Sequence, residues 1–250
     1  MNIVTPIKVD KLSYWLQGYN LKEKDYLLNG FTYGFKIPYQ GDRIYRFHKN
    51  LTSADFHNDV LMNKIGKELD AGRVGGPFHV SPFTNLQISP LGIVPKKTAG
   101  DFRVIHHLSY PEGTSINDGI PQNLCSVNYQ TIDDAIKLIQ YYGPSALLAK
   151  SDIEHSFKLI PIHPSDFELL GFAIDGKFYF DKTLPMGLSF SCNLFEKFTT
   201  SIHWIMDHKL KSPGSVHVLD DFLFIGPPNS DLCLKSLLNF LDLTKILAFL

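Results

Sequence analysis

The chain of 250 residues has few cysteines, no excess of positive charge and no long apolar segment. The three cysteines are far apart and form no Cys-x-x-Cys pair, which argues against a disulfide framework or a zinc site and favours a reducing compartment. A net charge of −1 gives no overall basic field of the kind that indicates a nucleic-acid partner. No apolar run suits a signal peptide or a membrane span. We therefore expect an intracellular protein, in the cytoplasm or nucleus, that is not secreted and has no membrane partner.

The chain is nevertheless long enough to bury a sizeable core, as one domain or two subdomains. A weak overall charge still allows phosphate binding, because only the cations along the contact track matter. The candidate basic strip consists of Lys96, Lys97, Arg103, Lys150 and Lys158. The alternative interpretation is that these five side chains are ordinary solvated surface residues.

Two adjacent aspartates, Asp220 and Asp221, interrupt an apolar run that reads as two short β-strands. Adjacent carboxylates repel each other and resist desolvation, so such a pair calls for a cation. Hard divalent cations that also hold phosphates suit carboxylate oxygens. An exposed hairpin turn is the alternative, because aspartate also favours turns.

Two further segments lie upstream of this pair. Residues 146–152 form an apolar run that ends in Asp152, and an aromatic, Phe157, follows five positions later. Residues 184–195 contain Leu184-Pro185-Met186-Gly187, a turn that opens a long helix with apolar periodicity. A strand-end aspartate, a Pro-x-Gly turn before a helix and an Asp-Asp hairpin, in this order, resemble motifs A, B and C of the reverse transcriptase palm.

The resemblance continues upstream and covers roughly residues 50–245. Residues 89–109, with the basic pair Lys96-Lys97 and Arg103, look like the fingers segment of the same family. The amino-acid sequence of residues 106–111 and 115–121 is most similar to that of retrotransposons of the DIRS type, which carry a tyrosine recombinase.

The resemblance implies an α+β polymerase right-hand fold, in which helices back an antiparallel palm sheet. It predicts a helical and aromatic lead-in over residues 1–75 that packs on the core. Fingers are expected at about 76–143 and 160–184, and palm at about 144–159 and 185–250. Family members continue into a thumb, so we expect a chain truncated before the thumb, with an exposed apolar end at 246–250 and little extension activity.

Periodicity and capping signals predict the individual elements. Thr52 and Asp55 suggest a capping box for the first helix, Thr131 and Asp134 one for the second, and Gly75-Gly76-Pro77 reads as a loop. The helices are expected at 53–71, ended by Gly72, at 132–142, at 189–210 and from 231 onward. The buried stripe of the helix at 189–210 is expected to consist of Phe190, Leu194, Phe198, Ile202, Ile205 and Met206. A strand is expected at 147–152, a turn or short helix near 165–170, and a hairpin at 171–180 with its turn at Asp175-Gly176.

For the chemistry, the resemblance implies two Mg²⁺ ions, for which Mn²⁺ is a possible substitute. Asp152 and Asp220 are expected to bridge the two ions, with Asp221 as an accessory carboxylate and the carbonyl of Ile153 as a further ligand. Asp152 alone could equally be a strand-end or helix-cap residue.

The resemblance also assigns residues to the incoming deoxynucleotide (dNTP). Lys97 and Arg103 would contact the triphosphate, and Lys96 could exchange roles with Lys97. Phe157 would be a steric gate against the 2′-hydroxyl, with a core aromatic as the alternative. Met186 and Gly187 would line the nucleotide pocket, although many relatives have Gln at the position of Met186.

The leading hypothesis is therefore an RNA-directed DNA polymerase domain of a retrotransposon, acting on an RNA or DNA template with a primer and dNTP. Other domains of the element's polyprotein are expected partners. One alternative is a truncated, non-catalytic remnant that only binds nucleic acid or a protein partner. Another is an RNA-directed RNA polymerase, which Phe157 argues against because such an enzyme must admit the 2′-hydroxyl.

Overall fold

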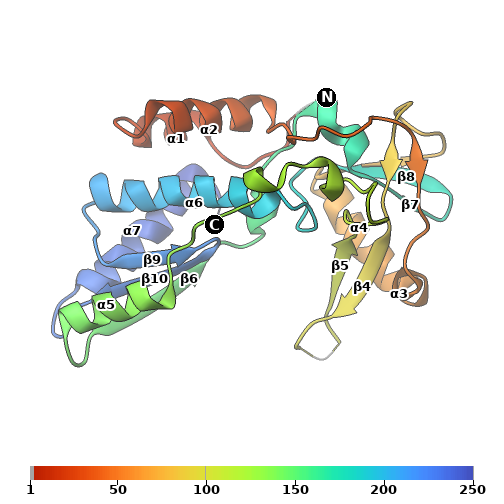
Figure 1. Ribbon diagram of the computed structural model, residues 1–250. Coiled ribbons are helices and arrows are strands. Elements are labelled where there is room, and N and C mark those ends of the chain that lie inside the picture. The colour runs from red at the N-terminus through yellow and green to blue at the C-terminus, as the bar shows by residue number, and fades with distance from the viewer. Residues whose placement is uncertain (1–2, 99, 250) are drawn as a thin grey trace. The chain divides into compact units, whose positions relative to one another are not determined.

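The computed structural model describes residues 3–98 and 100–249 and divides into two compact units. Unit 1 contains the chain up to Thr5, Tyr33–Cys125 and Ile160–Ser191. Unit 2 contains Pro6–Thr32, Ser126–Leu159 and the chain from Cys192 onward. The predicted lead-in, residues 1–75, is thus shared between the two units, each of which is described by itself below (Figure 1).

Unit 1 is built on a five-stranded sheet in the order β1-β3-β7-β8-β2. The pairs β1–β3 and β3–β7 are parallel, and the other two are antiparallel. The hairpin of β7 and β8 turns at Asp175-Gly176, as predicted, and both turn residues have positive φ. The strands are β1 Arg46–Phe47, β2 Val74–Phe78, β3 Gln87–Ile88, β7 Gly171–Ile174 and β8 Lys177–Asp181.

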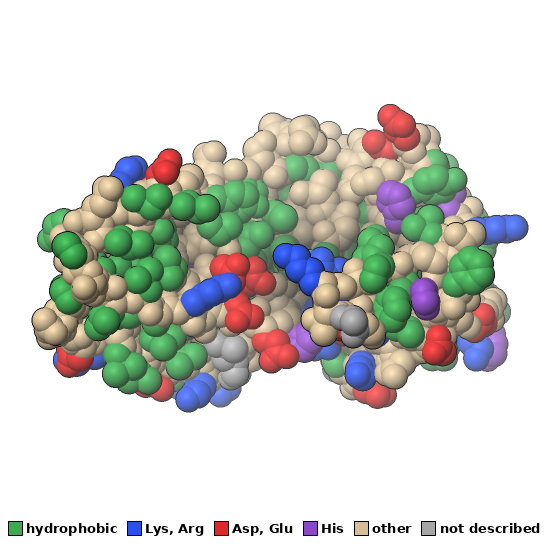
Figure 2. Space-filling view, turned by 90° about the horizontal axis from the view of Figure 1, so that it is seen from below, with side chains coloured by type: hydrophobic (Ala, Val, Ile, Leu, Met, Phe, Trp, Pro, Cys, Tyr) green, Lys and Arg blue, Asp and Glu red, His purple; other side chains and the backbone are tan. Residues whose placement is uncertain are grey.

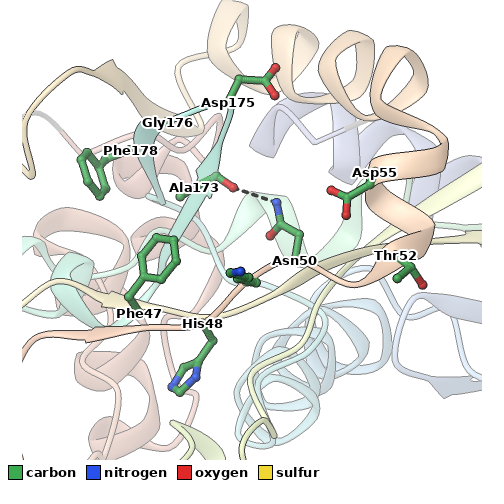
Figure 3. Close-up of a pocket in the computed structure, with 10 residues that line it drawn as sticks. Phe47, His48, Asn50, Thr52, Asp55, Ala173, Asp175, Gly176 and Phe178 are labelled. Carbon is green, nitrogen blue, oxygen red and sulfur yellow. Dashed lines mark hydrogen bonds between the residues drawn. The ribbon is translucent and has the colours of Figure 1, made fainter.

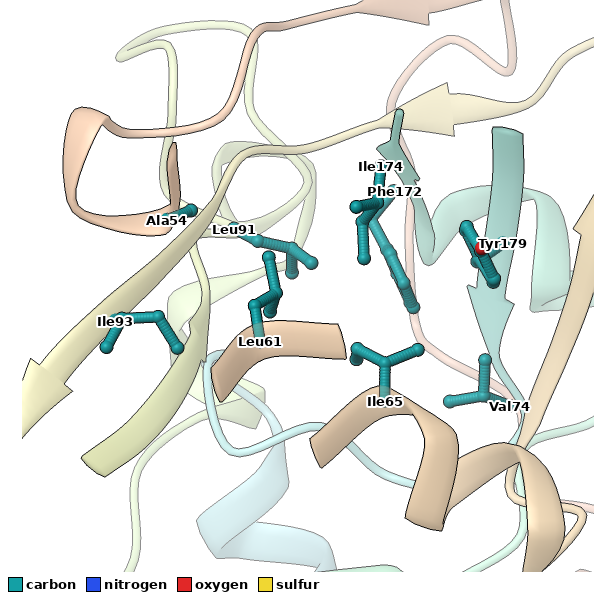
Figure 4. Packing of buried hydrophobic residues seen from close by; sticks show 9 residues of the cluster. All are labelled: Ala54, Leu61, Ile65, Val74, Leu91, Ile93, Phe172, Ile174 and Tyr179. Carbon is teal, nitrogen blue, oxygen red and sulfur yellow. The ribbon is translucent and has the colours of Figure 1, made fainter. Parts of the chain in front are cut away.

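A separate two-stranded hairpin, β4 (Leu91–Pro95) with β5 (Phe102–His106), carries the predicted basic segment. Its apolar side packs with helix α4 (Asn58–Asp70) and with β7 and β8 around one core. Figure 4 shows Leu61 and Ile65 of α4 facing Leu91, Phe172 and Tyr179. Burial of this shared apolar surface is what holds the hairpin against the helix.

The helix predicted at 53–71 is in fact two helices, α3 (Thr52–Phe56) and α4, which separate at His57. The predicted capping box is wrong, because Leu51 occupies the N-cap and no side chain caps α3. The hydroxyl of Ser53 accepts the Ile93 N–H at 3.1 Å, so the first turn is tied to β4 instead. Gly72, with φ of 71°, follows α4 as predicted.

The predicted loop Gly75-Gly76-Pro77 is also wrong, since it lies inside β2 at a bulge. A side chain at Gly75 would collide with the ring of Phe180, and one at Gly76 with Tyr179. The glycines therefore serve close packing of a strand on aromatic rings. The short 3₁₀ helices of this unit are η1 Asn117–Gly119, η2 Gln122–Leu124 and η4 Pro164–Leu169, the last of which confirms the predicted turn near 165–170.

Unit 2 is built on a three-stranded antiparallel sheet in the order β6-β10-β9. On one face, Phe222 packs on Phe240 of α7 and His217 packs on His203 of α6. Helix α5 contacts β9 and β10. The bounds are β6 Leu147–Asp152, β9 Ser215–Val218, β10 Asp221–Gly226, α1 Val9–Trp15, α2 Leu21–Tyr33, α5 Ile132–Tyr142, α6 Ser191–His208, α7 Leu232–Leu247 and η3 Ser156–Leu159.

Several predictions for this unit are confirmed. The strand at 147–152 has the predicted bounds, and α5 begins with the Thr131–Asp134 capping box. The predicted apolar stripe of α6 is buried: Leu194, Phe198, Ile202, Ile205 and Met206, preceded by Phe190. These residues recur at helical spacing, so one face of α6 supplies much of the core.

The apolar end of the chain was predicted to be exposed, and for two of its residues this is wrong. Leu247 and Phe249 are buried, and the Phe249 ring lies 5.5 Å from that of Phe198. Ile246 is partly exposed, and Leu250 lies outside the described residues.

Candidate active site

Strand pairing in unit 2 brings the three predicted aspartates together. Asp152 is the last residue of β6, and Asp221, the first of β10, is its direct partner across the antiparallel ladder. The Ile153 N–H donates to the carbonyl of Asp220 at 3.0 Å. Side chains opposite each other on paired strands lie about 5 Å apart at Cβ. The sheet thus gathers carboxylates from two separate segments at one end.

A tight turn places the aspartate pair. Val218 pairs with Asp221, so Leu219 and Asp220 alone connect β9 to β10. Leu219 has φ of 55°, a conformation usually left to Gly, Asn or Asp in two-residue hairpins. A branched apolar residue held there stores strain beside the carboxylates, as residues at functional sites often do.

One cation lies against this group. Lys150 Nζ is 2.9 Å from Asp221 Oδ1, and both side chains are well exposed. The hydrogen bond that Lys150 donates to Asp221, and the charges of Asp221, Asp152 and Asp220, raise the pKa of Lys150. An exposed pair of this kind contributes little stability. It shows, however, that Lys150 is engaged by one of the carboxylates.

The donor atoms of this group are of the kind that magnesium binds. Carboxylate oxygens and a backbone carbonyl are hard ligands, which Mg²⁺ prefers, and the Asp152 and Asp221 side chains are open to water. As the side chains stand, no three Asp, Glu, His or Cys groups within residues 3–98 and 100–249 converge to hold a metal ion. The chemistry of the donors fits the ion, and small side-chain rotations would be needed to bind it.

Phe157 lies in η3, four residues after Ile153, and is buried at 8 % exposure. Its ring packs on Phe195 of α6, with centroids 5.1 Å apart. The side chain therefore belongs to the core of unit 2, and its role as a steric gate stays a prediction. The Ile153 side chain is likewise buried, which leaves its backbone as the group available for a ligand role.

The predicted triphosphate residues lie in unit 1 on the β4–β5 hairpin. Lys96 Nζ is 2.7 Å from Asp101 Oδ2, and this lysine is the main cause of the lowered pKa of Asp101. Lys97 and Arg103 are exposed. Figure 2 shows a group of acidic side chains on the face that it draws.

The predicted pocket residues Met186 and Gly187 also belong to unit 1. Met186 is exposed, whereas a side chain at Gly187 would collide with the backbone carbonyl of His106. Asn117 holds this loop from both sides: its Nδ2 donates to the Gly187 carbonyl at 2.9 Å, and its Oδ1 accepts the Ser189 N–H at 2.9 Å. Sequence reasoning assigned Asn117 no role, and only the Asn-Asp-Gly turn signal marked its position.

A second residue that sequence reasoning missed is Glu196 of α6. Its side chain is buried, and its Oε2 accepts the N–H of Leu219 at the tip of the aspartate hairpin, at 3.0 Å. The available signal was a glutamate directly after Leu194 and Phe195 in a helix with a buried apolar stripe, where an acid is rare unless it is paired.

A cavity of about 440 Å³ in unit 1 contains none of the predicted site residues. It lies between the end of β1, α3 and the β7–β8 hairpin (Figure 3). The side-chain amide of Asn50, which lines this cavity, is hydrogen-bonded within the protein. Its Nδ2 donates to the Ala173 carbonyl at 2.8 Å, and its Oδ1 accepts the Leu91 N–H at 2.9 Å.

Solved structures of a viral protease-reverse transcriptase have a similar fold. The foamy viral protease-reverse transcriptase in complex with dsDNA matches with a TM-score of 0.61 at 16% identity, over 100% of this chain and 52% of that one. The chain has a reverse-transcriptase-like fold. The prototype foamy virus enzyme, a CSH mutant, matches with a TM-score of 0.62 at 17% identity, over 99% of this chain and 33% of that one. The same viral protein in complex with an RNA/DNA hybrid matches with a TM-score of 0.56 at 17% identity, over 99% of this chain and 33% of that one.

The chain with the reverse-transcriptase-like fold thus spans about half or less of the length of the structures it matches. No family model and no curated protein matches it. None of the described helices is both long and apolar enough to cross a membrane.

Proposed function

We propose that the chain is the RNA-directed DNA polymerase core of a retrotransposon of the DIRS type. The observation that carries the proposal is the pairing of Asp152 with Asp221, beside Asp220, at one end of an antiparallel sheet. A reverse-transcriptase-like fold accompanies this carboxylate group. The similar viral structures hold dsDNA or an RNA/DNA hybrid, which supports a template with a primer as the partner.

In the proposed reaction, Asp152 and Asp220 hold two magnesium ions, with Asp221 and the carbonyl of Ile153 as further ligands. The ions, when bound, activate the primer 3′-hydroxyl and neutralise charge on the leaving pyrophosphate. Lys150 would give up its bond to Asp221 when the ions bind, since like charges repel.

The remaining roles concern the incoming dNTP. Lys97 and Arg103 bind triphosphate oxygens, Arg103 with two parallel hydrogen bonds. Lys96 is paired with Asp101, so it is the alternative to Lys97 for the contact with the triphosphate. Met186 and Gly187 line the nucleotide pocket, and Phe157 excludes the 2′-hydroxyl. Other domains of the element's polyprotein would supply the rest of the nucleic-acid grip.

A non-catalytic remnant is the second candidate. The observation in its favour is the ion pair of Lys150 with Asp221, which neutralises one carboxylate without a metal ion. Such a remnant would bind nucleic acid or a protein partner and would catalyse nothing.

Primer extension by residues 1–250 on an RNA template distinguishes these functions. The proposal predicts magnesium-dependent addition of deoxynucleotides and poor addition of ribonucleotides. Binding of the template–primer without addition of either nucleotide would support the remnant. Efficient ribonucleotide addition would instead indicate an RNA polymerase.

A further inference from the structure

A buried carboxylate lies directly beneath the strained tip of the aspartate hairpin. Glu196 of α6 is 7 % exposed, and its Oε2 accepts the backbone N–H of Leu219 at 3.0 Å. Leu219 immediately precedes the Asp220-Asp221 pair and has φ of 55°. A charged acceptor makes a stronger hydrogen bond than a neutral one, and burial protects it from competing water. The bond thus opposes relaxation of a backbone conformation that leucine disfavours.

The other oxygen of Glu196 faces a chain of buried histidines. Oε1 lies 3.2 Å from His217 Nε2, although not in line for a hydrogen bond. His217 Nδ1 lies 2.7 Å from His203 Nδ1, and His203 Nε2 lies 3.0 Å from the hydroxyl of Ser215. Burial, followed by the nearby His217, lowers the pKa of His203 to about 4, so its ring is neutral at pH 7.

A carboxylate can only accept, and this selects one set of donors and acceptors for the two rings. The His217 proton is assigned to Nε2, which faces Glu196. His217 Nδ1 then accepts from His203 Nδ1, and His203 Nε2 accepts from the Ser215 hydroxyl. The backbone of His217 is held separately, because its N–H donates to Gln130 Oε1 at 2.8 Å. One carboxylate oxygen therefore accepts the Leu219 N–H, and the other faces the His217 ring without a hydrogen bond, so both contacts come from the same hairpin.

We propose that Glu196 is a positioning residue that holds the Leu219 turn and thereby sets the places of Asp220 and Asp221. The inference rests on the proposed function, in which these aspartates bind the metal ions. Losing the acceptor would let the turn move toward a less strained conformation. A shift of the carboxylates by about 1 Å is enough to cost on the order of 100-fold in rate.

The test compares four variants of the full chain with wild type. Glu196→Gln keeps an oxygen acceptor for the Leu219 N–H. Glu196→Asp keeps the charge but withdraws the carboxylate by one methylene, and Glu196→Leu removes the acceptor. Ser201→Ala is the matched control, because Ser201 is buried on the same helix and its hydroxyl bonds only to the Phe198 carbonyl of that helix.

Two readouts do not depend on polymerase activity. Amide hydrogen exchange at Leu219 should become about 10–100-fold faster in Glu196→Leu and Glu196→Asp, which matches the loss of a charge-assisted hydrogen bond. Binding of Mn²⁺ alone, followed by electron paramagnetic resonance, should weaken about 10-fold in the same variants. Ser201→Ala should stay within about twofold of wild type in both readouts, whereas Glu196→Gln, which keeps an acceptor but loses the charge, should fall between wild type and Glu196→Leu.

These readouts also separate the inference from the proposed function. If wild type extends no primer but exchange at Leu219 responds as expected, positioning of the turn stands and the polymerase proposal fails. If wild type extends primers, kcat should fall about 10–100-fold in Glu196→Asp with an unchanged KM for dNTP. Wild-type exchange at Leu219 in a folded Glu196→Asp or Glu196→Leu protein would overturn the inference.

A second substitution tests the strain directly and does not require Glu196→Leu to fold unaided. Glycine adopts positive φ freely, so Leu219→Gly should make the turn less dependent on its clamp. Glu196→Asp in the Leu219→Gly chain should then weaken Mn²⁺ binding by less than half as much as in wild type. Equal losses in both backgrounds would show that Glu196 acts on something other than the turn.

Discussion

At the scale of single residues, backbone pairing decides where the candidate active-site groups lie. Asp152 and Asp221 face each other because their strands are partners, and Asp220 occupies a two-residue turn. The aspartates and their order could be predicted from the sequence, because adjacent acids in an apolar run are unusual. Glu196 could not, because its importance depends on which N–H it meets, and that N–H is 23 residues away.

The buried His203 predicts a response to acid. Its pKa is lowered to about 4 by burial and by His217, so between pH 6.5 and 4 the unfolded chain binds a proton that the folded chain does not. The free energy of unfolding should therefore decrease by about 3 kcal/mol as the pH falls through this range. In His203→Gln, urea titrations at pH 7 and pH 4.5 should show a clearly smaller difference. The same difference in wild type and variant would exclude His203 as the cause.

One substitution distinguishes the two candidate roles of Phe157, a core aromatic and a steric gate against the 2′-hydroxyl. Phe157→Val removes a ring packed on Phe195, so it should lower the free energy of unfolding by about 1–3 kcal/mol. If the ring is also the steric gate, the ratio of ribonucleotide to deoxynucleotide incorporation should rise at least about 10-fold, which corresponds to about 1.4 kcal/mol. A folded variant with an unchanged ratio would leave Phe157 as a core residue only.

At the scale of helices and strands, the sequence is informative where a local signal decides the structure. The Thr131–Asp134 capping box, the Asp175-Gly176 turn and the apolar stripe of α6 were all predicted correctly because each acts within a few residues. The errors at Gly75-Gly76-Pro77 and at Thr52 have the opposite origin. There, distant partners, the Phe180 ring and the β4 backbone, decide what the segment does.

The two threonines provide a matched test of this distinction. The Thr131 hydroxyl accepts the Asp134 N–H, so Thr131→Ala should lower the free energy of unfolding by about 1 kcal/mol. Thr52 lies inside the first turn of α3 and caps nothing, so Thr52→Ala should change the free energy of unfolding by less than about 0.5 kcal/mol. Both values can be measured by urea denaturation. Equal losses in the two variants would contradict the assignment of the caps.

At the scale of the whole molecule, two compact units divide the predicted functional residues. Unit 2 holds Asp152, Ile153, Phe157, Asp220 and Asp221, and unit 1 holds Lys96, Lys97, Arg103, Met186 and Gly187. The sequence predicted the α+β class and the order of the segments. It did not predict that the first 75 residues contribute to both units, because the aromatic lead-in shows little periodicity.

The central claim is that Asp152 and Asp220 serve one metal-dependent reaction, and single-nucleotide addition to a primer tests it most directly. High template–primer concentration compensates for weak binding, and the control is Asp133→Asn, which removes an acid in the first turn of α5. The account predicts magnesium-dependent addition by wild type and by the control. In folded Asp152→Asn and Asp220→Asn proteins, the rate should fall at least about 1000-fold, since a lost ligand removes several kcal/mol of transition-state stabilisation. Addition at the wild-type rate in either variant, or none by wild type, would contradict the account.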